Sequence, residues 1–176
     1  MKTVHSQQRL DIRADYDVIV AGAGPAGICA AVAAACEGAR VALVERYGVV
    51  GGNLTAGYVG PILGMVGRGT MRDEIVRLLG VPDNDMIGLT GKAHDFEEAK
   101  RTLAEFVAQE NIDVYLQSAV YDVIKENDAV QGLILATNQG PFALTARITV
   151  DATGDAVVEI ASANSFNGGY GKQVLL

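Results

Sequence analysis

The spacing of apolar positions changes several times along the chain, and each spacing predicts a different element. Residues 17–21 form a short run rich in β-branched residues, which is typical of a buried strand. Residues 25–37 are good helix formers that follow a glycine-rich turn, and residues 40–45 form a second apolar run. This order predicts a β-α-β unit, in which the crossover makes the two strands parallel.

Two further helices are expected after a glycine-rich stretch at residues 48–69. The first has apolar residues on one face, ends at Gly80 and is followed by a loop at residues 81–91. Its apolar face contains Met71, Ile75, Leu78 and Leu79. Asp95 is suited to be the N-cap of the second helix, with Glu98 completing a capping box. The buried face of this helix is expected to contain Phe96, Ala99, Leu103, Phe106 and Val107.

The second half of the chain has the spacing of strands. Residues 113–116 predict a third parallel strand, and residues 148–152 predict a last buried strand. Between them lie three runs separated by turns at 126–128 and 138–140, which predict a meander at residues 119–125, 129–137 and 142–146. We therefore expect an α/β fold, a parallel sheet with helices and a three-stranded antiparallel β-meander. A final helix is expected within residues 156–163.

Composition and charge narrow the functions that this fold could serve. The chain has 176 residues, 49% of them hydrophobic, and a formal net charge of −7. An acidic chain is a poor match for nucleic acid or for a membrane surface, because both favour a basic face. The first 15 residues are polar and mixed in charge, unlike a secretory signal peptide. We expect a lead-in at residues 1–15, one domain at 16–163 and an irregular tail at 164–176.

The two cysteines and two histidines do not have the spacing of a metal site. Cys29 and Cys36 lie seven residues apart in the first helix, about 10 Å, which is too far for a disulfide. They could form a redox pair, but helix packing is the simpler interpretation, and the compartment is expected to be the reducing cytoplasm. His94 could donate a proton in a redox site, but we expect an exposed residue that precedes the helix cap.

The turn after the first strand has the pattern Gly22-x-Gly24-x-x-Gly27. The first glycine permits a tight turn, the second lets the backbone approach a pyrophosphate, and the third lets the helix pack closely on the sheet. Pro25 and Ala26 lie at the start of the helix, whose positive end points at the phosphates. Because this pattern follows a strand and begins a helix, it predicts a dinucleotide-binding site.

An acidic residue ends the second predicted strand. The carboxylate of Glu45 can accept hydrogen bonds from the hydroxyls of an adenosine ribose, and it would repel a 2′-phosphate. NADP is therefore disfavoured, although Arg46 beside it could bind a phosphate. These residues alone do not separate NAD from FAD.

Three segments, which follow one another along the chain, favour FAD over NAD because they resemble a known family. The run from Asp17 to Glu45, the segment RYGVVGGNLTAG and the segment ITVDATGD resemble the FAD-dependent oxidoreductases of the glutathione-reductase-like superfamily. They are most similar to the group with a GGxxT loop after the acidic strand and an ATGD segment after a β-meander. The resemblance covers residues 16–155 and implies a Rossmann-like FAD/NAD(P)-binding domain with FAD as the cofactor.

The resemblance also implies a role for individual residues. Pyrophosphate contacts are expected from Gly22, Gly24 and Gly27, and adenosine contacts from Glu45 and Arg46. Close approach to the pyrophosphate and ribityl chain is expected from Gly51, Gly52 and Thr55. The main chain of Val120 would meet the adenine. The chain would return to the nucleotide at Ala152, Thr153 and Gly154.

The expected function is that of an FAD-dependent oxidoreductase, or of its FAD-binding portion, acting on an unknown small molecule. No side chain is singled out as catalytic, because the flavin carries the chemistry. The family continues into a substrate domain beyond its ATGD segment, so the end of this chain suggests a truncated protein or a fragment. Two alternatives stay open: an NAD-binding dehydrogenase module, and a non-catalytic nucleotide-binding remnant. Self-association through an exposed apolar surface is a further hypothesis.

Overall fold

A computed structural model describes residues 9–60, 62, 69–80, 94–108 and 111–163. The predicted β-α-β unit is present as strand β1 (Ile12–Ala21), helix α1 (Pro25–Cys36) and strand β2 (Val41–Val44). Strand β2 pairs parallel with β1, as the spacing predicted. The predictions for the tail at 164–176, the loop at 81–91 and parts of the lead-in and the glycine-rich stretch lie outside the described residues.

One six-stranded sheet organises the chain, in the order β3-β2-β1-β6-β5-β4. Strand β3 (Ile112–Tyr115) extends the parallel part, and β6 (Phe142–Asp151) pairs parallel with β1 on its other side. Strands β4 (Ala119–Glu126) and β5 (Ala129–Ala136) join β6 in antiparallel pairs. The α/β class and the antiparallel meander are therefore confirmed, and the meander continues the parallel sheet.

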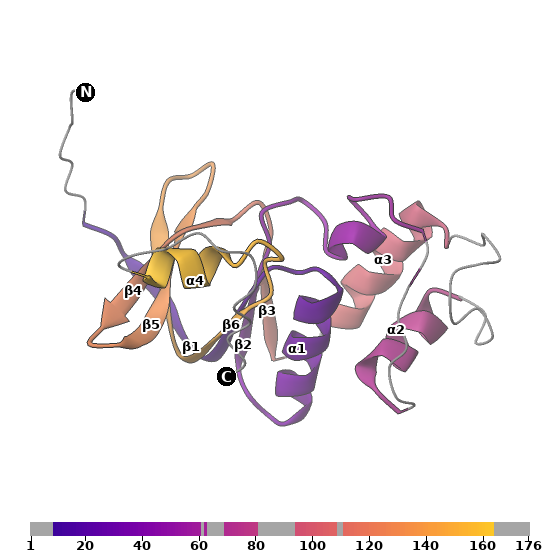
Figure 1. Cartoon of the computed structure of the whole chain (residues 1–176), viewed down its shortest axis with the longest axis horizontal. Helices are drawn as coiled ribbons and strands as arrows, with labels where there is room; N and C mark the ends of the chain where they lie inside the picture. The colour runs from indigo at the N-terminus through magenta and orange to yellow at the C-terminus, as the bar shows by residue number, and fades with distance from the viewer. Residues whose placement is uncertain (1–8, 61, 63–68, 81–93, 109–110, 164–176) are drawn as a thin grey trace.

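The two faces of the sheet have different covers (Figure 1). Alternate residues of β1 point to opposite faces, so Val18 and Val20 pack on one side while Ile19 and Ala21 pack on the other. Helices α1, α2 (Met71–Leu78) and α3 (Phe96–Val107) lie on the first side. On the second side, apolar residues of β5 and β6 and Val158 of helix α4 (Val157–Ser162) join the cluster around Ile19 and Ala21. A short 3-10 helix, η1 (Gly52–Leu54), lies in the segment after β2.

Strand boundaries differ from the prediction at two places. Strand β1 begins at Ile12 rather than at residue 17, because its polar first half pairs with β6 and the Arg13 guanidinium lies 3.8 Å from the centre of the Phe142 ring. The last two predicted strands are one continuous strand, β6. Its pairing with β5 ends at Thr145, whereas its pairing with β1 runs on to Asp151. An exposed Arg147 interrupts the apolar pattern there without interrupting the strand.

Helix α3 confirms the predicted N-cap. The Asp95 side chain accepts hydrogen bonds from the backbone N–H groups of Glu97 at 2.9 Å and Glu98 at 3.0 Å. The side chain of Glu98 forms an ion pair with Arg101 instead of the return bond of a capping box. Ala99, Leu103 and Val107 are buried as expected. Within the described residues, no helix has both the length and the apolar character required for a membrane crossing.

Candidate functional site

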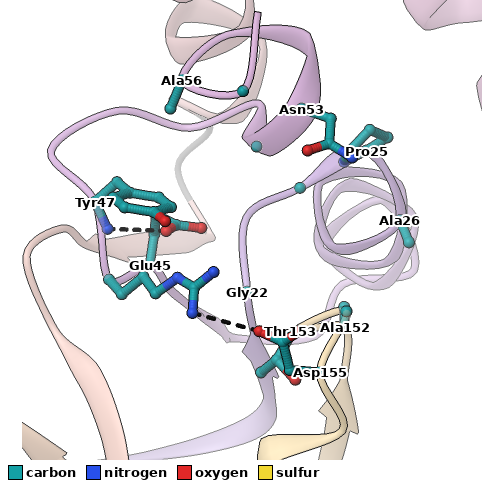
Figure 2. A pocket seen from close by; sticks show the side chains of 15 residues that line it. Gly22, Pro25, Ala26, Glu45, Tyr47, Asn53, Ala56, Ala152, Thr153 and Asp155 are labelled. Carbon is teal, nitrogen blue, oxygen red and sulfur yellow. Dashed lines mark hydrogen bonds and ion pairs between the residues drawn. The ribbon is translucent and has the colours of Figure 1, made fainter. Parts of the chain in front are cut away.

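A hollow of about 530 Å³ lies where the first turn and the end of β6 meet the segment that follows β2 (Figure 2). It is formed by residues from four segments of the chain, 22–26, 45–47, 52–57 and 152–155. Those predicted as site residues are Gly22, Gly24, Pro25, Ala26, Glu45, Arg46, Gly52, Ala152, Thr153 and Gly154. Those that the sequence pattern did not indicate are Tyr47, Asn53, Ala56, Gly57 and Asp155.

Two of the three motif glycines are required by the packing of the protein itself. Gly22 has a φ of +93°, and a Cβ atom there would lie 2.5 Å from the carbonyl oxygen of Ala152. A Cβ atom on Gly27 would lie 1.8 Å from the carbonyl oxygen of Gly22. The helix therefore packs against the turn at a distance that only glycine allows.

Gly24 differs from its two neighbours in the motif. Its φ is −72°, which any residue adopts, and an added Cβ atom would meet no protein atom within 4 Å. It is the N-cap residue of α1, it makes no side-chain cap bond, and Pro25 follows it at the start of the helix. The first N–H groups of a helix lack intrahelical partners and carry partial positive charge. An anion can therefore approach the backbone at this point from the hollow.

The carboxylate of Glu45 braces the same turn. Only 5% of the residue is exposed, and its Oε2 accepts a hydrogen bond of 2.8 Å from the backbone N–H of Ala23. Its Oε1 accepts a second bond of 2.8 Å from the N–H of Tyr47. A carboxylate oxygen has a further lone pair, so the side chain can still accept hydrogen bonds from a ligand. The bracing role was not predicted from the sequence.

A second, smaller hollow of about 130 Å³ adjoins the first and shares Gly22, Glu45, Arg46 and Thr153 with it. Its remaining lining residues are Val44, Ser118, Ala119, Val120 and Val157. Val120 is thus brought to the site from the start of the meander, although it is 75 positions from Glu45. The two hollows together form a path from the meander to the loop around η1.

An exposed ion pair connects two walls of this path. The guanidinium of Arg46 lies 3.4 Å from Asp155 Oδ2, and it also lies 4.9 Å from the centre of the Tyr47 ring (Figure 2). Both side chains of the pair are more than half exposed. The pair therefore connects the end of β2 to the turn after β6, and both of its side chains stay exposed to solvent.

The loop from Gly51 to Thr55 lies against the first turn. The N–H of Gly51 donates a 2.7 Å hydrogen bond to the carbonyl of Ala23, and a Cβ atom on Gly52 would lie 2.9 Å from Gly24 Cα. Thr55 is fully buried, and its hydroxyl donates a 2.6 Å hydrogen bond to the carbonyl of Val50. Gly51 and Thr55 are absent from the lining of both hollows, so their side of the loop shapes the site from behind.

The turn after β6 is shaped by a residue that we did not predict. Asp151 Oδ1 accepts hydrogen bonds from the N–H and the hydroxyl of Thr153, at 3.1 and 2.7 Å. Its Oδ2 accepts bonds from the N–H groups of Val158 and Glu159 at the start of α4. The signal was an aspartate two residues before a threonine, a pattern that favours local side chain–backbone bonds.

The predicted exposure of His94 is wrong. Only 7% of the residue is exposed, and its Nε2 lies 2.7 Å from the carbonyl oxygen of Leu54. The ring also packs edge-on against Phe96, with the ring centres 5.0 Å apart. A position next to a helix cap suggested solvent exposure, but the segment around η1 covers it.

The two cysteines are free thiols, as predicted. Cys29 is half-buried in α1, and burial raises the pKa of its thiol. Cys36 is exposed at the end of the same helix. A raised pKa disfavours the thiolate, so Cys29 is a packing residue of α1 rather than an activated nucleophile.

A family model described as FAD dependent oxidoreductase matches residues 17–173. The thiamine thiazole synthase of Desulfosudis oleivorans is 32% identical over 165 residues, which cover 85% of this chain and 60% of that protein. The soluble pyridine nucleotide transhydrogenase of a Marinomonas species is 30% identical over 79% of this chain and 30% of its own length. The chain therefore spans only part of the length of these relatives.

Solved structures share the fold. The crystal structure of THI4 from Thermovibrio ammonificans matches with a TM-score of 0.60 and 27% identity, over 84% of this chain and 61% of that one. A geranylgeranyl bacteriochlorophyll reductase-like protein from Thermoplasma acidophilum matches with a TM-score of 0.59 and 21% identity, covering 84% of this chain and 42% of that one. The second likeness concerns the fold alone.

Proposed function

Because this chain belongs to the FAD dependent oxidoreductase family, and its cofactor is accordingly FAD, we propose that the two adjoining hollows hold the dinucleotide. The bound flavin supplies hydride or electron transfer, and the chain supplies binding and orientation. The substrate is a small molecule. The named relatives are a thiazole synthase and a transhydrogenase, so their names favour no single reaction for this chain.

The observation that carries this proposal is the open space beside Gly24. Packing accounts for glycine at positions 22 and 27, but no protein atom lies within 4 Å of a Cβ atom added at 24. A glycine that the protein does not need for its own packing leaves the backbone free for a ligand to approach closely. The start of a 12-residue helix at this position favours an anionic group, such as a diphosphate.

The remaining contacts follow along the path from this point. Glu45 would accept hydrogen bonds from the adenosine ribose, and the smaller hollow beside Val120 would take the adenine. Arg46 would lie along the adenosine. The ribityl chain and the flavin would extend through the larger hollow toward Gly52, with Gly51 and Thr55 supporting that loop from behind. Ala152, Thr153 and Gly154 would close the side opposite the loop.

Several finer assignments are part of the same proposal. The GGxxT loop and the ATGD segment favour the group of the glutathione-reductase-like superfamily that has both segments. Residues 16–163 would form the FAD-binding domain, preceded by a lead-in. The cytoplasm is the proposed location, since both cysteines are free thiols. The proposal includes self-association through an exposed apolar surface, which light scattering tests by measuring the mass of the particle in solution.

The proposal is tested by Gly24→Ala, with Gly48→Ala as the matched control. A Cβ atom on Gly24 would occupy space that we assign to the cofactor, whereas one on Gly48 would meet only the Gln117 side chain, at 3.6 Å or more. We expect Gly24→Ala to weaken FAD binding at least about tenfold, which is ~1.4 kcal/mol. Gly48→Ala should leave the melting temperature of the apoprotein close to that of the wild type, and Gly24→Ala should lower apoprotein stability by no more than about 1 kcal/mol, because alanine is a poorer N-cap than glycine.

FAD affinity is measured by flavin fluorescence quenching, and NAD is titrated in parallel. Unchanged FAD affinity in Gly24→Ala would contradict the assignment of the pyrophosphate to this turn. Selective binding of NAD by the wild type would favour the dehydrogenase alternative. A folded wild type that binds neither nucleotide would favour a non-catalytic remnant.

A further inference from the structure

His94 is a buried titratable residue outside both hollows. It directly precedes the N-cap residue Asp95 of α3, so the helix cap fixes its position. Its Nε2 lies 2.7 Å from the carbonyl oxygen of Leu54, the last residue of η1. Gly52 and Asn53 of the same short helix line the larger hollow. A side chain of the α3 segment therefore bonds the back of the loop whose front borders the site.

The chemistry of this contact fixes which atom donates the hydrogen bond. A carbonyl oxygen only accepts hydrogen bonds, so Nε2 carries a proton and donates it to Leu54. Nδ1 is buried and has no hydrogen-bond partner among the described residues. His94 thus donates one hydrogen bond to the loop through Nε2.

Other contacts from α3 fix the same loop by packing. The ring of Phe96 packs on His94, at 5.0 Å between centres, and on Tyr58, three residues after the loop, at 5.1 Å. Leu103 Cδ1 would lie 3.0 Å from a Cβ atom on Gly51, so the helix lies directly behind the glycine pair. On its other side the loop bonds the first turn through the N–H of Gly51. The loop is therefore held between α3 and the turn that we assign to the pyrophosphate.

We propose that His94 is a positioning residue for the cofactor, which holds the Gly51–Thr55 loop at the depth required for its backbone to contact bound FAD. The inference rests on the proposed function, because that function places FAD in front of the loop. His94 does not touch the cofactor. Its effect passes through the Leu54 carbonyl, which would lose a buried donor if the imidazole were replaced by an apolar group.

Two substitutions separate the hydrogen bond from the packing of the ring. His94→Phe keeps an aromatic ring against Phe96 but removes the donor. His94→Gln loses the ring but keeps an amide N–H close to the position of Nε2. We expect His94→Phe to weaken FAD binding about tenfold, and His94→Gln to stay within about threefold of the wild type.

The measurements are made on the full chain: FAD affinity by fluorescence quenching, the visible circular dichroism of bound flavin, and the melting temperature of the apoprotein. A lower flavin dichroism in His94→Phe than in His94→Gln, at comparable apoprotein stability, supports positioning through the donor. If His94→Phe does not fold, the affinity of His94→Gln decides, and a tenfold loss in that variant overturns the proposal.

Equal FAD affinity in His94→Phe and the wild type would also overturn the proposal. So would an equal loss in both variants, because that result would assign the effect to the ring and not to its N–H group. These outcomes are distinct from a failure of the proposed function, in which Gly24→Ala leaves FAD affinity unchanged. In that case FAD binds elsewhere and the inference about His94 fails with its premise.

Discussion

Two glycine-rich segments border the candidate site, and they are held in shape in different ways. At Gly22 and Gly27 the first turn is held by backbone atoms that approach too closely for any side chain. The loop from Gly51 to Thr55 also contacts the turn through its backbone, but two further hydrogen bonds that hold it come from side chains. One comes from the Thr55 hydroxyl within the loop, and another comes from His94, which is 40 positions from Leu54.

This difference predicts different responses to substitution. A steric contact between backbone atoms cannot relax without moving a strand or a helix, so one methyl group has a large effect. A buried hydrogen bond contributes a smaller and more variable free energy, and a substitute donor can restore it. Substitutions at Gly22 and Gly27 should therefore lower stability strongly, whereas substitutions in the loop should lower it in graded steps.

The largest effect is expected for Gly27→Ala. The added Cβ atom would lie 1.8 Å from the carbonyl oxygen of Gly22, a backbone atom of the turn that no side-chain rotation can move away. Alanine favours helix over glycine by ~1 kcal/mol, but we expect the clash to outweigh this gain and to lower the free energy of unfolding by about 3 kcal/mol. Urea unfolding followed by circular dichroism measures the change.

Ala33→Gly is the control for this variant. Ala33 is exposed on the same helix, so its replacement should cost only the helix propensity of ~1 kcal/mol. If Gly27→Ala were as stable as the wild type, the close packing of α1 on the turn would be refuted. The first turn would then not be held by close backbone contacts.

A smaller effect is expected for Thr55→Val in the loop. Valine fills nearly the same volume but removes the hydroxyl that donates to the buried carbonyl of Val50. The unpaired carbonyl should lower the free energy of unfolding by ~2 kcal/mol and should weaken FAD binding through the loop. Thr55→Ser keeps the donor and should lose only ~1 kcal/mol, for one methyl group. A larger loss of unfolding free energy in Thr55→Ser than in Thr55→Val would show that packing, and not the hydroxyl, holds the loop.

The same contrast explains how much of the molecule could be predicted from the sequence. The β-α-β unit, the N-cap of α3 and the meander have local signals, so the prediction located them to within a few residues. The boundaries of β1 and β6 depend on their pairing with each other, which the apolar spacing does not contain. The polar first half of β1 and the exposed Arg147 of β6 concealed that pairing.

The site shows the same division. Gly22 and Gly24 of the first turn, the carboxylate of Glu45 and the ATGD segment were indicated by short motifs, and the fold brings them to the same hollow. Gly27, the third glycine of the motif, packs behind the turn and does not line the hollow. The burial of His94 was not indicated, since its partner is the backbone of a segment elsewhere in the chain. Asp151 had a local signal in its spacing from Thr153, which the prediction did not use.

The smallest effect is expected for the contact that depends on neither close packing nor burial. Asp155→Asn removes the charge that faces Arg46 at 3.4 Å, but both side chains are more than half exposed. Exposed ion pairs contribute at most about 1 kcal/mol and are screened by salt. We expect a loss of unfolding free energy below this value, which should shrink further when sodium chloride is raised from low to high concentration. A double-mutant cycle with Arg46→Gln isolates the pair. A loss as large as that of Thr55→Val, or one that salt leaves unchanged, would mean that the pair is more deeply embedded in the site than its exposure indicates.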